Sequence, residues 1–284
     1  DALDGSGDDG SGETEPYDDQ GHGSHCAGIS AGTGAVEEGP LSDGATPYRG
    51  IAPDAWLVGV KVLDSGGSGS FAEVMKGMEW TIDNKIKYNI RAASMSLGGV
   101  WLIELTQEQE ERITHLANEM VAAGISLMIA AGNSAGYGTI GTPGAAKDVI
   151  TVGSTEDSKD LAVYSSKGPT HEGQIKPNVA AIGSAVMSVE ANSGNGYASY
   201  SGTSMATPMV AGMAALLLQA NPDLQPLMIR TILESTSEYK FLTHPVRPNN
   251  DYGWGFVLMD TALEEAIQYD ASLSINISAD TSVI

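Results

Sequence analysis

The sequence has one cysteine, few basic residues and no long apolar run. Because Cys26 cannot form an internal disulfide, packing, hydrogen bonds or bound ions must stabilise the 284 residues. Only 14 Lys and Arg oppose 36 Asp and Glu, and the formal charge of −22 disfavours nucleic acid and anionic membranes as partners. The most apolar stretch, residues 205–220, contains Pro208 and Gly212 and is shorter than the roughly 20 residues of a membrane span. We predict a buried helix there, no nucleic-acid partner and no membrane partner.

Basic residues are also absent before Arg49, and the chain starts with neither an initiator Met nor a secretion signal. Residues 1–20 contain six Asp, two Glu and four Gly, a composition typical of a loop. We expect an N-terminal part to precede this acidic loop segment. The carboxylates of the first 48 residues form either a solvated surface or a calcium-binding surface, since calcium prefers clustered oxygen ligands. The acidic candidates are Asp18, Asp19, Glu37, Glu38 and Asp43.

From residue 56 onward, short apolar runs alternate with longer helical patterns. The runs at 56–63, 92–97, 125–131 and 149–152 are rich in Val, Ile, Leu and Ala, and helical patterns cover 71–84 and 107–123. This alternation predicts an α/β fold with a mostly parallel β-sheet and helices on both faces. We expect one domain over residues 21–271 with a last helix from Thr261. The tail at 272–284 alternates like a strand and would begin a β-rich module.

Three motifs carry residue types suited to acyl transfer. Gly21-His22-Gly offers an imidazole base, Gly202-Thr-Ser204 offers a hydroxyl nucleophile, and Ala-Gly132-Asn133 offers an amide donor for an oxyanion. Each motif alone is common in turns and helix caps. Their joint presence on one α/β chain favours a catalytic serine site.

With these motifs the chain resembles the subtilisin-like serine proteases, the subtilases, from about residue 17 to residue 266. The resemblance implies that His22 is the general base, Ser204 the nucleophile, Asn133 the oxyanion-hole amide and His25 a structural neighbour. It implies hydrolysis of peptide bonds through an acyl-enzyme, with no cofactor required for the chemistry. It also implies structural calcium, a propeptide, protein or peptide substrates and a secreted or extracellular location.

Two further segments resemble the subtilase strands that hold an extended substrate between them. The residues concerned are Gly67, Ser68 and Gly69 on one side and Ser96, Leu97, Gly98 and Gly99 on the other, with Gly132 beside the oxyanion amide. An extended peptide that adds to such edges gains main-chain hydrogen bonds. Asp251-Tyr-Gly253-Trp-Gly255 resembles the turn before the last helix of the family.

The aspartate of the subtilase triad has no counterpart in this sequence. The family carries it in an Asp-Thr-Gly or Asp-Ser-Gly segment after a buried strand, whereas the nearest candidate, Asp4, stands among Asp and Gly only 18 positions before His22. We expect the first strand and its aspartate to lie upstream of Asp1. The alternative is a non-catalytic, peptide-binding subtilase domain. A lipase-like esterase is disfavoured, because Ser204 stands in Gly-x-Ser-x-Ala instead of the Gly-x-Ser-x-Gly elbow.

The remaining Cys and His residues do not indicate a second catalytic site or a zinc site. Cys26 follows His22 by one helical turn, so we expect a small buried residue near the site. Met209 replaces a histidine that many subtilases have after Thr-Pro. His115, His171 and His244 show no zinc-ligand spacing.

Overall fold

The computed structural model describes residues 17–34, 48–99, 107–239 and 245–269. In chain order, the elements are α1 (His22–Ala31), α2 (Phe71–Asp83), α3 (Lys85–Tyr88), β1 (Ala92–Met95), α4 (Gln107–Ala122), β2 (Ser126–Ala130), β3 (Ile150–Thr155), β4 (Val179–Ile182), β5 (Val186–Val189), β6 (Tyr197–Tyr200), α5 (Thr203–Ala220), α6 (Pro226–Ser235) and α7 (Met259–Gln268).

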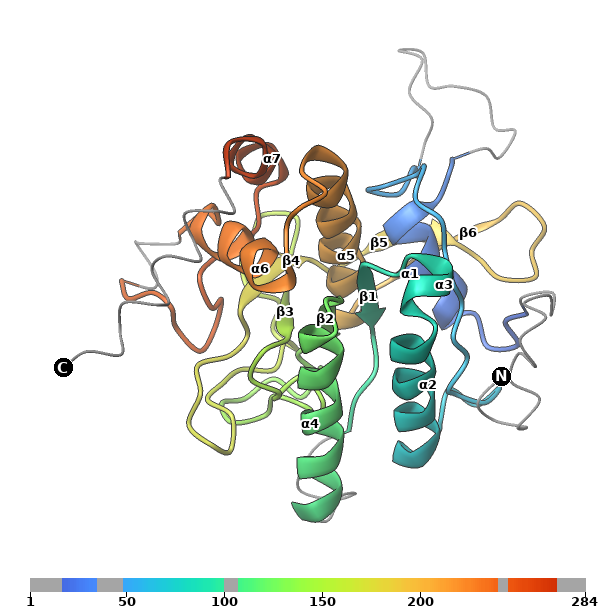
Figure 1. Cartoon of the computed structure of the whole chain (residues 1–284), viewed down its shortest axis with the longest axis horizontal. Helices are drawn as coiled ribbons and strands as arrows, with labels where there is room; N and C mark the ends of the chain where they lie inside the picture. Colours follow the sequence, from blue (N-terminus) through green and yellow to red (C-terminus); the bar gives the residue numbers. More distant parts are fainter. Residues whose placement is uncertain (1–16, 35–47, 100–106, 240–244, 270–284) are drawn as a thin grey trace.

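The centre of the fold is a parallel sheet in the order β1-β2-β3-β4 (Figure 1). Ala92 pairs with Ser126, Met128 with Ile150 and Val152 with Val179, all in parallel register. Strands β2 and β3 are buried along their whole length, as expected when helices cover both faces. The predicted α/β fold with a parallel sheet is confirmed.

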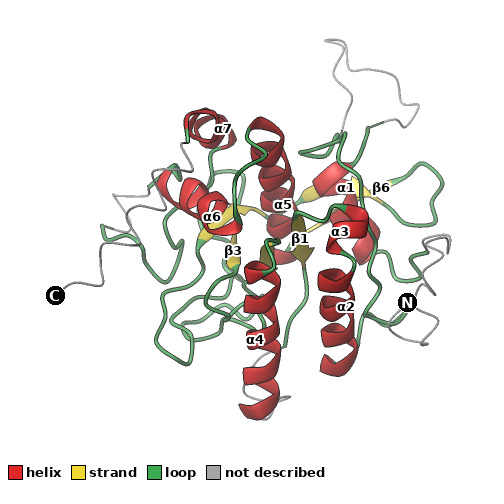
Figure 2. Ribbon diagram, in the orientation of Figure 1, coloured by secondary structure: helices red, strands yellow, loops and turns green. Residues whose placement is uncertain are grey.

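Two helical layers enclose this sheet (Figure 2). Leu127 and Ile129 of β2 pack with α2 and α4, whereas Met128 packs with α5, α6 and α7. This alternation follows from the two-residue period of a strand, which sends successive side chains to opposite faces. One strand therefore takes part in both cores.

Local signals explain where the helices begin and end. A capping box starts α2, because Ser70 Oγ accepts the N–H of Glu73 at 3.2 Å and Glu73 Oε2 accepts the N–H of Ser70 at 2.6 Å. Acidic Glu108 and Glu110 lie in the first turn of α4, beside the positive end of its dipole. Gly124, with φ of +88°, follows the end of α4.

The helix predicted over residues 205–220 is α5. By length and hydropathy alone it could cross a membrane, but 61% of it is buried inside the structure, as in a core helix. A small antiparallel hairpin of β5 and β6 packs against α1.

A buried lysine joins the end of this sheet to α6. Lys176, 2% exposed, donates through Nζ to the carbonyl of Val149 at 3.0 Å and to Oδ1 of Asn178 at 2.8 Å. Asn178 in turn donates through Nδ2 to Glu234 on α6 at 2.8 Å. Burial lowers the pKa of Lys176 well below its ordinary value.

One strand prediction is wrong, and several elements are additional to those predicted. Residues 56–63 form no strand, because the segment has no strand beside it to pair with among the described residues. The sequence patterns did not predict α3, β4, the β5–β6 hairpin or α6. The last helix starts at Met259 and ends at Gln268, short of residue 271. The acidic start to residue 16 and the tail at 272–284 lie outside the described residues.

Candidate active site

Ser204 lies in the first turn of α5, and a proline one turn later shapes its surroundings. Because Pro208 has no N–H, the carbonyl of Ser204 cannot accept the usual helical hydrogen bond. That carbonyl instead accepts from Ser96 Oγ at 2.8 Å and from Cys26 Sγ at 3.4 Å. The serine is thereby tied to the segment after β1 and to α1.

The reactive atoms of Ser204 remain available. Its Oγ is 3.4 Å from the carbonyl oxygen of Ser96, a long contact, and the side chain is half-buried. No acceptor within the described structure takes the backbone N–H of Ser204. An unpaired N–H at a helix start is a suitable donor for an anion.

Asn133 faces the same helix start, and its amide is fixed in one orientation. Oδ1 accepts the backbone N–H of Thr203 at 2.9 Å and the Thr203 hydroxyl at 3.1 Å. With the oxygen occupied in this way, Nδ2 is directed away from Thr203 and has no hydrogen-bond partner among the described residues. Asn133 is exposed, so this amide can donate to a bound group. Gly132 donates its N–H to Thr203 Oγ1 at 3.2 Å.

His22 is the first residue of α1 and contacts Cys26. The Cys26 sulfur is 3.9 Å from Nδ1 and 4.0 Å from Nε2 of the ring. Burial is the main cause that lowers the pKa of His22, with His25 adding to it and Asp18 opposing it, so the ring is neutral at pH 7. No hydrogen bond joins His22 to Ser204 in the described part of the chain, and no carboxylate there bonds to the His22 ring.

Cys26 and His25 hold α1 in place. Burial raises the pKa of Cys26 to about 11, so its thiol stays protonated and is a poor nucleophile. His25 is fully buried, bonds through Nε2 to the carbonyl of Ala198 at 2.9 Å and stacks on Tyr200. Both side chains thus help to position His22.

Asp18 caps α1, a role that the sequence analysis did not assign. Its carboxylate accepts the N–H groups of Gln20 at 3.0 Å, Gly21 at 2.8 Å and Ser24 at 2.7 Å. Partial burial acts to raise the pKa of Asp18, but the bonds from Gly21, Ser24 and Gln20 outweigh it and lower the pKa to about 2. The signal in the sequence was an Asp a few residues before a helix.

We expect Asp18→Ala to destabilise the protein by about 1–2 kcal/mol, the usual size of a lost helix cap. Because the folded-state pKa lies below the ordinary 3.8, this contribution is present above about pH 4 and is lost as the pH falls toward 2. Thermal unfolding at pH 7 and pH 2.5 would therefore show a clearly larger difference from wild type at pH 7 than at pH 2.5. The control Asp19→Ala removes an ion pair with Lys61 and should cost less. Equal losses in the two variants at pH 7 would contradict the cap.

The calcium candidates do not assemble into a site within the described residues. Asp18 is occupied by three N–H groups, and Asp19 pairs with Lys61 at 2.7 Å. Glu37, Glu38 and Asp43 lie outside the described residues, as does Asp4. Across the ranges that the structure describes, no three His, Cys, Asp or Glu side chains are grouped as metal ligands. His115 pairs with Glu119, and His244 lies outside those ranges.

The two segments predicted to hold substrate differ in what they contact. Gly67, Ser68 and Gly69 are exposed in the turn before α2, where the N–H of Asp64 bonds to the carbonyl of Ser68. Ser96, Leu97, Gly98 and Gly99 follow β1, and Ser96 contacts Ser204 directly. Gly99 exchanges two backbone hydrogen bonds with Thr142, each 3.0 Å long.

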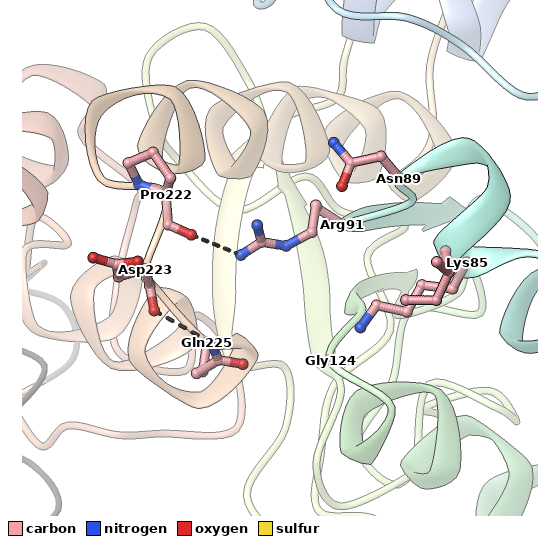
Figure 3. Close-up of a pocket in the computed structure, with 8 residues that line it drawn as sticks. Lys85, Asn89, Arg91, Gly124, Pro222, Asp223 and Gln225 are labelled. Carbon is pink, nitrogen blue, oxygen red and sulfur yellow. Dashed lines mark hydrogen bonds between the residues drawn. The ribbon is translucent and has the colours of Figure 1, made fainter.

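A separate polar pocket of about 310 Å³ lies at the opposite, amino end of β1 and β2 (Figure 3). Arg91 points across it and donates to the carbonyls of Pro222 and Leu224, and Lys85 bonds to the carbonyl of Ala123. These cations therefore stabilise loop and helix ends. The pocket contains none of the predicted catalytic residues.

Comparison with known protein families shows to which family the chain belongs. Residues 2–255 match the sequence pattern described as the subtilase family. The chain belongs to the subtilase family. Its Asp-Gln-Gly-His-Gly-Ser-His, Ala-Gly-Asn and Gly-Thr-Ser motifs all fall inside the matched region.

This subtilase is similar to characterised bacterial proteases. It is 42% identical over 253 residues to serine protease AprX of Bacillus subtilis strain 168, across 80% of this chain and 54% of AprX. It is 36% identical over 230 residues to subtilisin DY of Bacillus licheniformis, across 80% of this chain and 74% of that protein. The chain thus spans about half the length of AprX. Its structure superposes on that of sphericase with a TM-score of 0.71 and 30% identity, over 86% of this chain and 79% of sphericase.

Proposed function

We propose that the protein is a serine endopeptidase that cleaves protein or peptide substrates bound in extended form. The observation that carries the proposal is the pair of free donors at the start of α5, which are the Ser204 N–H and the fixed Nδ2 of Asn133. Two such donors suit the negative charge that develops on a carbonyl oxygen under attack.

In the proposed reaction, Ser204 Oγ bonds to the substrate carbonyl carbon while neutral His22 takes the hydroxyl proton. The carbonyl oxygen becomes an oxyanion held by Asn133 and the Ser204 N–H. His22 then gives the proton to the leaving amine as the peptide bond breaks. Water, deprotonated by His22, then attacks the acyl carbon; the bond from that carbon to Ser204 Oγ breaks, His22 returns the proton to Oγ, and the acid product leaves. The substrate backbone would lie between Gly67–Gly69 and Ser96–Gly99.

One observation favours a second candidate, a non-catalytic peptide-binding domain. His22 has no carboxylate bonded to its ring in the described structure, and a catalytic imidazole needs such a partner for orientation. The endopeptidase requires a Ser204 hydroxyl that reacts as a nucleophile, whereas the non-catalytic peptide-binding domain does not.

We expect a serine-directed fluorophosphonate to add once to the folded protein. Ser204 Oγ would attack phosphorus, fluoride would leave, and His22 would take the proton. Intact mass should show one adduct, and Ser204→Ala should show none. The control Ser201→Ala, a neighbouring exposed serine, should retain the adduct. A folded wild-type chain that stays unmodified after long incubation would show that Ser204 is not activated within residues 1–284 and would overturn catalysis by this chain.

A further inference from the structure

Asp251, in the turn before the last helix, is a nearly buried carboxylate to which the proposed reaction assigns no role. The residue is 8% exposed. Its Oδ1 and Oδ2 accept from the hydroxyl of Tyr137 at 3.2 and 3.1 Å, and Oδ1 also lies 3.2 Å from Nζ of Lys167. Lys167 forms no other ion pair within the described ranges. One carboxylate therefore joins three parts of the chain that are far apart in the sequence.

The turn that carries Asp251 is itself fixed to the central sheet. The side-chain oxygen of Asn249 accepts the N–H of Asp251 at 3.0 Å. Three residues later, Trp254 donates its N–H to the carbonyl of Asn178, directly before β4, at 2.8 Å. Because the backbone on both sides is held, the Asp251 carboxylate is a fixed support for the groups that bond to it.

Tyr137 and Lys167 belong to two segments, residues 132–139 and 164–168, that lie side by side. A parallel β-bridge joins Tyr137 to Lys167, and the N–H of Thr139 bonds to the carbonyl of Lys167 at 3.0 Å. The Lys167 ammonium also lies 5.1 Å from the centre of the Tyr137 ring, a cation–π distance. Asp251 thus bonds to both members of these paired segments.

The paired segments hold the backbone of Asn133. The N–H of Ser166 donates to the carbonyl of Gly132 at 2.9 Å, and Ser166 Oγ accepts the N–H of Ser134 at 3.1 Å. Gly132 approaches so closely that a Cβ there would lie 2.8 Å from Ser166 Oγ. Both neighbours of Asn133 are therefore bonded to the residue that precedes Lys167.

Asn133 depends on this support because its amide must point to one place. Thr203 orients the side-chain oxygen, whereas the bonds to the two neighbours hold the backbone of Asn133. A donor stabilises an oxyanion only within hydrogen-bond distance, and a displacement of 1 Å can slow a reaction by about 10²-fold. Without its charge, Asp251 would leave the Lys167 ammonium unpaired, and the paired segments would lose their support.

We propose that Asp251 is a positioning residue for Asn133. Through Lys167 and Tyr137 it fixes the paired segments, and these hold the Asn133 amide where the oxyanion forms. Asp251 acts through these residues and not on the reacting atoms. The effect on the reaction rests on the proposed function, whereas the fixing of the paired segments does not.

The first test uses the whole chain with Asp251→Asn, a substitution that keeps the shape of the side chain. The maximal rate of fluorophosphonate labelling at Ser204 should fall by about 10–10²-fold, the size expected for a displaced donor. The reagent concentration that gives half-maximal rate should stay the same, because binding of the reagent is not affected. Lys167→Met and Tyr137→Phe each remove one contact and should slow labelling less. If Asp251→Asn does not fold, Lys167→Met serves for the same test.

Glu238→Gln is the matched control. It breaks another lysine–carboxylate ion pair, between Lys159 and Glu238 at 2.5 Å, and neither residue bonds to the paired segments in the described structure. This variant should label at the wild-type rate, with all rates measured at a temperature at which each variant is folded. Equal slowing in Glu238→Gln and Asp251→Asn would overturn the positioning role.

A double variant distinguishes positioning from a general loss of stability. In a chain that already carries Asn133→Ala, no amide remains to be positioned, so adding Asp251→Asn should cause almost no further slowing. If the two losses multiplied, Asp251 would act on the Ser204 reaction by another route, and the positioning role would be overturned.

Hydrogen exchange tests the fixing of the paired segments without any reaction. In Asp251→Asn, the peptide that covers residues 132–139 should exchange about tenfold faster, the size expected for one ion pair and one hydrogen bond, and α2 should not change. Unchanged exchange at 132–139 would overturn the fixing. Faster exchange with wild-type labelling would overturn the positioning role alone. Faster exchange in a protein whose wild-type Ser204 never labels would keep the fixing and overturn the proposed function.

Discussion

If Asn133 holds the oxyanion as proposed, replacing it with aspartate is expected to slow fluorophosphonate labelling of Ser204 by about 10²–10³-fold, the loss seen when subtilisin loses its oxyanion-hole amide. The substitution is nearly isosteric and retains the oxygen that accepts from Thr203 at the start of α5. It removes the free N–H₂ donor and places a negative charge where the oxyanion forms. The expected loss therefore comes from the chemistry and not from the fold.

Two controls distinguish a loss of the oxyanion donor from a loss of folding stability. The melting temperature of Asn133→Asp should match or exceed that of wild type, because a carboxylate at a helix N-terminus is favourable. Asn133→Ala should label as slowly and also melt earlier, since the Thr203 N–H loses its acceptor. If Asn133→Asp labelled at the wild-type rate, the amide would have no part in holding the oxyanion.

Gly253→Ala is expected to give the largest loss of stability, about 3–5 kcal/mol, or a fall in melting temperature of roughly 10 °C. Gly253 has φ of +63° and closes a tight turn through reciprocal backbone bonds with Asn249. An added Cβ would overlap the carbonyl oxygens of Pro177 and Asn178, which are backbone atoms next to β4. Neither the φ angle nor the clash can relax without moving that strand.

Gly138→Ala is the matched control for this prediction. Gly138 has a similar φ of +72°, but no atom lies within 4 Å of the position of a Cβ. Gly138→Ala should therefore lower the free energy of unfolding by only about 1–2 kcal/mol, the cost of placing a residue with a Cβ in the left-handed conformation. Thermal unfolding of the two variants measures the difference, and equal losses would show that the contact with Pro177 and Asn178 is not what makes Gly253 necessary.

The sequence predicted the elements whose apolar pattern is long or whose ends carry clear signals. α2 and α4 begin and end within about a residue of the predicted bounds, because a capping box, first-turn carboxylates and Gly124 mark them. β4 and the β5–β6 hairpin were not recognised, since four-residue strands show too little period to stand out. Propensity alone also predicted a strand at 56–63, where pairing, not composition, decides the outcome.

For the candidate site too, the sequence predicted some features and could not predict others. The motifs brought attention to His22, Asn133 and Ser204, and the fold places Asn133 and Ser204 at the start of one helix. The sequence could not show that Pro208 releases the Ser204 carbonyl to Ser96 and Cys26, because that depends on segments meeting from three parts of the chain. Nor could it distinguish Asp18 as a helix cap from Asp18 as a metal ligand, since both roles use the same oxygens.

The buried amine of Lys176 can report how often this subtilase unfolds locally. An amine-reactive acetylating reagent needs access to the nitrogen, and Lys176 is covered while the other eight lysines of the chain are not buried to this degree where the structure describes them. Once the fold opens near β3 and α6, its Nζ loses the carbonyl of Val149 and the amide of Asn178 and becomes as reactive as any other. The rate at which the peptide containing Lys176 gains an acetyl group thus records how often the carboxyl-terminal core opens, in an unlabelled and unmutated protein.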